Sequence, residues 1–131
     1  MFSANNKQLK IKEVIAFIQA AVKKEPKFVK EPVTYPGIHG ARLEAYYLEL
    51  HSKAGLIVTS DPPLFPIVNG DITPKTFQTE SVLTVGQLLT FLKDAADDNV
   101  PVSSLVCFNE NTEPSRILNN HVMWGLCISP Y

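Results

Sequence analysis

The chain is poor in cysteine and has no long apolar run, and each shortage excludes a class of protein. Two cysteines among 131 residues, Cys107 and Cys127, cannot form the disulfide framework of a small secreted domain. Both lie in apolar, strand-like runs, so we expect two buried thiols in a reducing compartment, with a disulfide between adjacent strands as the alternative. No run of about 18 apolar residues and no N-terminal signal segment occurs. The sequence therefore predicts a cytoplasmic protein that does not contact membranes.

Catalytic and metal-binding motifs are also missing. The three histidines, His39, His51 and His121, fall in no His-x-x-x-His frame, and there is no Cys-x-x-Cys pair. There is no glycine-rich phosphate loop and no Gly-x-Ser-x-Gly turn. We therefore expect no cofactor, no metal site and no enzymatic activity.

Charge is balanced overall but uneven along the chain. The net charge of −1 gives no field that attracts nucleic acid, so sequence-specific nucleic-acid binding is not expected. Residues 7–31 hold seven lysines against three glutamates, whereas residues 94–113 hold five acids and no base. This pattern is typical of two solvated faces. The alternatives are a basic face for an acidic or phosphate-bearing partner, and head-to-tail pairing in a homo-oligomer.

The best-specified stretch, Leu83–Phe108, predicts one helix followed by one buried strand. Thr84 is a good N-cap, and Gln87 completes a Thr-x-x-Gln capping box. Apolar residues then recur at helical spacing to Ala96, where an acidic turn and a proline end the pattern. The apolar run Leu105–Phe108 predicts a strand that is covered on both faces.

A gap-free copy of this helix lies 74 positions earlier and predicts a first helix that ends near Lys24. The positions that align are Ile11, Val14, Ile15, Phe17, Ile18, Ala21 and Val22 on Val85, Leu88, Leu89, Phe91, Leu92, Ala95 and Ala96. Two unrelated amphipathic helices would also match in this way. The alternative is a duplicated helix-plus-hairpin unit, with repeat units 9–60 and 83–128 inside a single domain of residues 1–131. The expected fold class is α+β, with two main helices packed on a mostly antiparallel sheet.

The remaining segments are expected to be short strands and loops. A loose N-terminus over 1–7 comes first, and prolines confine the extended pieces Phe28–Val29 and Val33–Tyr35 to sheet edges. The later expectations are a hairpin of Ala41–Leu50 with Leu56–Thr59, a small hairpin over Phe65–Pro74, a lead-in at Thr76–Ser81, a polar connection over 109–120 and a last strand at Val122–Ile128.

Aromatic and arginine side chains give the best indication of a binding site. Tyrosine, tryptophan and arginine anchor many interfaces, and arginine recognises carboxylate or phosphate through two hydrogen bonds. Arg42 and Arg116 are the only arginines in the chain. We predict that a protein partner, or a small anionic ligand, is bound by members of one set: Tyr35, His39, Arg42, Tyr46, Tyr47, Phe65, Asn69, Arg116 and Trp124.

The segment over residues 83–102 resembles small uncharacterised phage and prophage accessory proteins, which carry a Thr-Val-Gly-(Glu/Gln)-Leu helix, an acidic turn and a Val-rich strand. The matching residues are Thr84, Val85, Gly86, Gln87, Leu88, Leu92, Asp97, Asp98, Val100, Pro101 and Val102. Those proteins place proline before the acidic residue of the turn, and this chain places it after. The resemblance implies a small viral protein, in the host cytoplasm, that binds and blocks a host factor or sequesters a small molecule.

The residues together favour a non-enzymatic binding protein. An oligomer-forming component of a larger viral assembly is the alternative, because charge is uneven and the strands are rich in proline. A small enzyme that acts on a nucleotide or phosphate ester, through histidines and acids brought together by the fold, is the third hypothesis.

Overall fold

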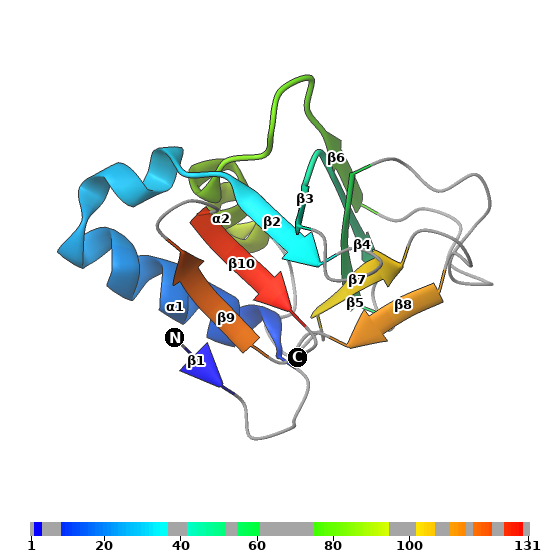
Figure 1. The fold of residues 1–131 in the computed structure, drawn as a ribbon, viewed down its shortest axis with the longest axis horizontal. Helices are drawn as coiled ribbons and strands as arrows, with labels where there is room; N and C mark the ends of the chain where they lie inside the picture. Colours follow the sequence, from blue (N-terminus) through cyan, green and yellow to red (C-terminus); the bar gives the residue numbers. More distant parts are fainter. Residues whose placement is uncertain are drawn as a thin grey trace.

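The computed structural model describes residues 2–3, 9–36, 42–51, 55–60, 75–94, 102–106, 111–114, 117–121 and 125–129. It confirms the α+β class, with two α-helices, a short 3-10 helix and two five-stranded sheets (Figure 1). In chain order the elements are β1 (Phe2–Ser3), α1 (Ile11–Lys24), η1 (Pro26–Lys30), β2 (Val33–Pro36), β3 (Arg42–Glu44), β4 (Tyr47–His51), β5 (Gly55–Thr59), β6 (Lys75–Gln78), α2 (Val85–Lys93), β7 (Val102–Val106), β8 (Asn111–Pro114), β9 (Ile117–His121) and β10 (Gly125–Ser129).

The second helix begins as its sequence predicts. The Thr84 hydroxyl accepts from the backbone N–H of Gln87 at 3.2 Å, and the Gln87 side chain accepts from the N–H of Thr84 at 2.9 Å. This reciprocal pair satisfies two of the donors that every helix leaves unpaired at its N-terminus. The helix ends at Lys93, earlier than the apolar spacing predicts.

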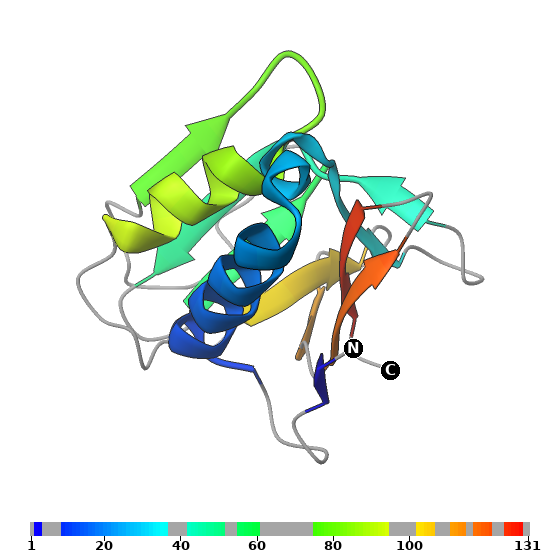
Figure 2. The same ribbon diagram turned by 90° about the vertical axis from the view of Figure 1, so that its left-hand side faces the viewer.

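Each sheet is antiparallel except for one parallel pair. One sheet has the strand order β1-β9-β10-β2-β3 with β10 parallel to β2, and the other has the order β6-β4-β5-β7-β8 with β5 parallel to β7. The two helices lie beside each other against these sheets (Figure 2). The single sheet that was expected is therefore replaced by two.

The two halves of the chain have the same order of strands and α-helix and the same strand pairing, whereas η1 has no described counterpart in the second half. The hairpin β4–β5 pairs Tyr47 with Thr59 and His51 with Gly55, and β9–β10 repeats this register 70 positions later, from Ile117 and Ser129 to His121 and Gly125. Phe77 of β6 lies opposite Leu48, as Phe2 of β1 lies opposite Leu118. The two halves are therefore alike in their strand pairing, and the likeness begins one strand before each helix.

The halves exchange their hairpins. The sheet that holds β1, β2 and β3 from the first half is completed by β9–β10 from the second half. The sheet that holds β6, β7 and β8 is completed in the same way by β4–β5. Each half therefore depends on the other for two central strands.

One hydrophobic core joins both halves. Its buried members come from the two helices, η1 and the helix-facing sides of both sheets, and they include Val14, Ile18, Phe28, Val33, Tyr35, Leu48, Leu56, Val58, Leu88, Leu92, Leu118, Leu126 and Ile128. Burial of a side chain of this size contributes about 1.5–3 kcal/mol, so the shared core stabilises the exchanged arrangement.

Several local expectations were wrong. Phe28 and Val29 lie in η1 and not in an extended piece, and β2 is an inner strand between β10 and β3 and not an edge. Prolines stand only beside or at the end of β2, so the hydrogen bonds of its middle residues are kept. Strands also form where a loose terminus, a lead-in and a polar connection were expected: β1, β6, β8 and β9. The small hairpin expected over Phe65–Pro74 lies outside the described residues.

Cys127 is buried, as expected, and Cys107 lies outside the described residues.

Candidate functional site

The residues predicted to bind a ligand are only partly within the described chain. Tyr35, Arg42, Tyr46 and Tyr47 are described, and the other members of the set are not: His39, Phe65, Asn69, Arg116 and Trp124. Tyr35 lies on β2 and Arg42 on β3, in one sheet; Tyr46 comes just before β4 and Tyr47 begins it, in the other sheet.

Tyr35 lies in the core and has no exposed surface. Its hydroxyl donates to Ser60 Oγ at 2.8 Å and accepts from the Ser60 backbone N–H at 2.7 Å. Ser60 Oγ in turn donates to the carbonyl oxygen of Glu44 at 2.6 Å. This chain of hydrogen bonds fixes the end of β5 to β3, so Tyr35 has a structural role.

Tyr47 is also buried, and it is paired with an acid. Its hydroxyl donates to Glu49 Oε1 at 2.7 Å, and both side chains are less than a tenth exposed. Burial, followed by the hydrogen bond to Glu49 and its charge, raises the pKa of Tyr47 above its ordinary value. Tyr46 and Arg42 are half-buried, and the Tyr46 hydroxyl donates to Glu44 Oε2 at 3.5 Å. The described residues of the predicted cluster therefore point to local structure more than to one site.

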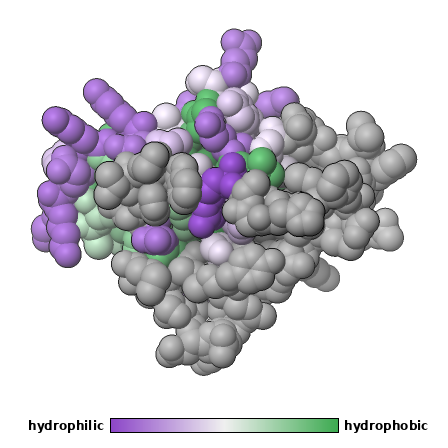
Figure 3. Space-filling model, in the orientation of Figure 1, coloured by the Kyte–Doolittle hydropathy of each residue, from purple (hydrophilic) through white to green (hydrophobic). Residues whose placement is uncertain are grey.

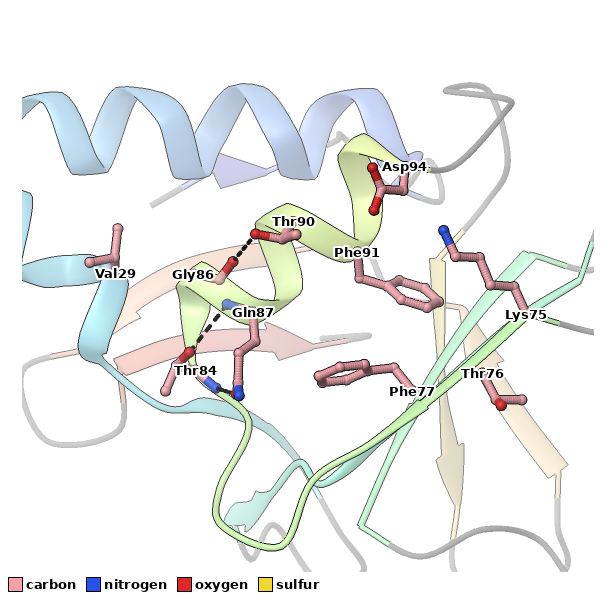
Figure 4. Close-up of a pocket in the computed structure, with 10 residues that line it drawn as sticks. All are labelled: Val29, Lys75, Thr76, Phe77, Thr84, Gly86, Gln87, Thr90, Phe91 and Asp94. Atoms are coloured by element: carbon pink, nitrogen blue, oxygen red, sulfur yellow. Dashed lines mark hydrogen bonds between the residues drawn. The ribbon is translucent and has the colours of Figure 1, made fainter.

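A groove lies elsewhere, between α2 and the edge strand β6 (Figure 4). We call it the α2–β6 groove. Its volume is about 460 Å³, and it is lined mainly by apolar surface from Val29, Lys75, Thr76, Phe77, Thr84, Gly86, Gln87, Thr90, Phe91 and Asp94. A volume of roughly 300–1,000 Å³ is usual for a ligand pocket.

Two aromatic rings form the floor of the groove. The centroids of Phe77 and Phe91 are 6.3 Å apart with an angle of 50° between the ring planes, within the range of favourable aromatic pairs. The Lys75 ammonium lies 5.0 Å from the centroid of the Phe91 ring, at cation–π distance. The groove therefore offers an apolar surface, with the opposite charges of Lys75 and Asp94 among its lining residues.

The helix wall of the groove has little free hydrogen-bonding capacity. Thr84 and Gln87 bond to each other through the capping box, and the Thr90 hydroxyl donates to the carbonyl of Gly86 at 3.0 Å. Gly86 also permits a close approach, because a Cβ there would lie 3.2 Å from the carbonyl oxygen of Val29. The Val85 N–H donates to the carbonyl of Glu31 at 2.9 Å and holds the start of α2 against the end of η1.

The backbone of β6 has one side without a partner strand among the described residues. β6 pairs with β4 and ends the order of its sheet. The Thr79 N–H donates to the carbonyl of Tyr46 at 2.9 Å, and bonded positions alternate along an antiparallel pair. The N–H and C=O groups of Phe77 and Lys75 therefore face β4, and those of Thr76 and Gln78 face outward.

Sequence reasoning missed this groove because it treated residues 76–81 as a lead-in. The signal was weak: β6 has four residues, and only Phe77 among them is apolar. Phe77 and Phe2 are recognised as equivalent only from the strand register. The reason is that the offset in sequence between them differs from the offset between the two helices.

The described residues give no indication of a metal site or a membrane span. Within these parts of the chain, no group of three or more His, Cys, Asp or Glu residues could hold a metal ion. Neither described helix is long and apolar enough to cross a bilayer. No protein-family model, curated protein or solved structure matches the chain.

Proposed function

We propose that this chain is a binding protein that captures an extended segment of a partner protein in the α2–β6 groove. The segment adds to the outer side of β6 as a further strand and places an apolar side chain against Phe77 and Phe91. The observation that carries the proposal is the position of an edge strand beside an apolar groove. The resemblance of residues 83–102 to phage accessory proteins makes a host protein the expected source of the segment.

In strand addition, the backbone supplies hydrogen bonds that do not depend on sequence, and the side chains supply selectivity. The outward N–H and C=O groups of Thr76 and Gln78 bond to the backbone of the segment, whatever its sequence. The floor of the groove then selects an apolar anchor, whose burial contributes about 1.5–3 kcal/mol. Lys75 on this short edge strand limits uncontrolled edge-to-edge aggregation, as charged residues do on many sheet edges.

The test is a selection of random peptides of about twelve residues, displayed on mRNA, against the full chain. The tightest peptide is labelled with fluorescein, and its Kd is measured by fluorescence anisotropy. Thr76→Pro removes one outward donor and keeps the bonds to β4, so we expect binding to weaken about tenfold or more. Thr76→Ala is the matched control, and it keeps the backbone donor; its Kd is expected to stay within about twofold of the parent value.

A second variant, with a check of its fold, separates the loss of an outward donor from misfolding as the cause of weaker binding. Gln78→Pro removes the other outward donor, and circular dichroism and urea unfolding check the fold of each variant. Equal affinity of the proline variants and the parent chain would overturn strand addition, and would leave a small ligand in the groove as the better reading. If light scattering instead shows a dimer that Thr76→Pro dissociates, β6 pairs with a second copy and the oligomer hypothesis gains over capture of a partner.

A further inference from the structure

The alternation of side chains along β6 determines which residues of a captured segment enter the α2–β6 groove. Opposite residues of an antiparallel pair turn their side chains to the same face of the sheet. Phe77 lies opposite Leu48, a member of the core, so the Phe77 side chain lies on the face that is turned to α2 (Figure 4). A residue of the segment that lies opposite Phe77 therefore enters the groove. Its two neighbours, opposite Thr76 and Gln78, turn to the other face.

The direction of the segment decides which further residue turns into the groove. β6 begins at Lys75, beside Asp94, and runs toward the end of the groove where Thr84 lies (Figure 4). Antiparallel pairs are the commoner and the slightly more stable arrangement, so the added strand is expected to run the opposite way. The residue two positions before its apolar anchor then faces the groove at the end where α2 begins.

Gln87 stands on the helix wall near that end. Its side chain extends from α2 to the level of the Phe77 ring (Figure 4). The Oε1 atom accepts from the Thr84 N–H at 2.9 Å, and this bond fixes which end of the amide is the donor. The Nε2 group carries two donors, and no described residue accepts from it. The capping box already holds Gln87 in one position, so little side-chain entropy is lost when Nε2 donates to an occupant of the groove.

We propose that Gln87 determines the specificity of the groove, by donating from Nε2 to an uncharged acceptor side chain two residues before the apolar anchor. The proposal rests on the proposed function, since it concerns the occupant of the same groove. Asparagine, glutamine, serine and threonine carry such an acceptor. The acceptor is uncharged because acids already stand at this end: Glu80 is exposed shortly before α2, and the carbonyl of Glu31 accepts from the first N–H of that helix.

The test replaces the donor of Gln87 with an acceptor and keeps the helix cap. Gln87→Glu retains the capping box, because glutamate at this position accepts from the N-cap N–H as glutamine does. The selected, labelled peptide is synthesised in two forms that differ only two residues before the anchor. One form carries N,N-dimethylasparagine, which accepts and cannot donate, and the other carries diaminobutyric acid, whose ammonium donates and cannot accept.

Fluorescence anisotropy measures the Kd of each form with each chain. We expect the acceptor form to bind Gln87→Glu about fivefold more weakly than the parent chain, because two acceptors then face each other. The donor form should change in the opposite direction by about the same factor or more, because an ammonium then meets a carboxylate. Among the selected peptides, acceptor side chains should be enriched two residues before the anchor.

Gln19→Glu is the matched control, since it makes the same change of charge at an exposed position of α1. Hydrophilic side chains project over α1 and η1 in the space-filling view (Figure 3). This control should change the Kd of both forms less than twofold at about 0.15 M salt.

Two results would overturn the role of Gln87: an unchanged affinity of Gln87→Glu for the acceptor form, or selected peptides without a preference two residues before the anchor. If Thr76→Pro and Gln78→Pro still weaken binding in that case, strand addition stands. If the proline variants bind as the parent chain does, strand addition fails. The two proposals are therefore distinguished by separate variants.

Discussion

The two halves of this chain share one topology, but they differ at the helix that each contributes. Gly86 of α2 corresponds to Lys12 of α1, and Thr84 corresponds to Lys10. Gly86 lets η1 approach α2, and Thr84 caps the helix beside the groove, whereas Lys12 is exposed and Lys10 makes no capping bond. Packing therefore maintains the same pattern of strands in both halves. The groove, by contrast, depends on a few residues that only the second half has.

The largest effect is expected at a glycine that begins the second strand of an exchanged hairpin. Gly125 has a positive φ of 64°, and a Cβ there would collide with the carbonyl oxygen of Pro32. Gly125→Ala should lower the free energy of unfolding by about 4 kcal/mol, because backbone strain and overpacking add. Urea unfolding measures the change.

Gly55 is the equivalent residue of the other hairpin, and its substitution tests whether an added Cβ costs the same unfolding free energy in both hairpins. Its φ is also positive, at 106°, so Gly55→Ala should lower the free energy of unfolding by about 2 kcal/mol from backbone strain. A loss at Gly55 as large as that at Gly125 would contradict the special closeness of β10 to Pro32.

An intermediate effect is expected where the helices carry equivalent phenylalanines. Phe91 is almost fully buried at the floor of the groove, whereas its counterpart Phe17 is only partly buried. Phe91→Ala should lower the free energy of unfolding by about 3 kcal/mol, and Phe17→Ala by about 1 kcal/mol. Thermal and urea unfolding compare the two variants, and equal losses would mean that the halves are equally packed at this position.

The smallest effect concerns the caps. Thr84→Ala removes the capping box and should lower the free energy of unfolding by about 1 kcal/mol. Lys10→Thr should raise it by about 0.5 kcal/mol, because Glu13 already stands three residues later and completes a Thr-x-x-Glu box on α1. A loss of stability in Lys10→Thr, measured by urea unfolding, would show that α1 begins differently from α2.

The helices were the most predictable part of the fold, and the strands were the least. Thr84, Gln87 and the apolar stripe of α2 act within one or two turns, so their meaning is visible in the sequence. The hairpin of β4 with β5 was predictable in part, since its strands are close in the chain. The single strand expected over Ala41–Leu50 is instead divided into β3 and β4, which belong to different sheets. By contrast, the four-residue β6 and β8 carry too few apolar residues to give an alternating pattern.

The binding residues were predicted from their type, and type does not determine exposure. Tyr35 and Tyr47 were chosen as tyrosines near an arginine, yet both are buried and bonded to Ser60 and Glu49. Lys75 and Phe91 were not chosen, although the fold brings them to one groove from elements separated in sequence. A groove is a property of packed surfaces, and neither composition nor spacing records it.

The sequence by itself determined the fold class, the two amphipathic helices, the capping box and the weak internal copy, because each depends on residues a few positions apart. Only the tertiary structure decided the two sheets, the exchanged hairpins and the groove. Val33 pairs with Leu126, and Phe2 with Leu118, across most of the chain. Such pairs form because they complete one shared core, and the free energy of that core depends on every element at once.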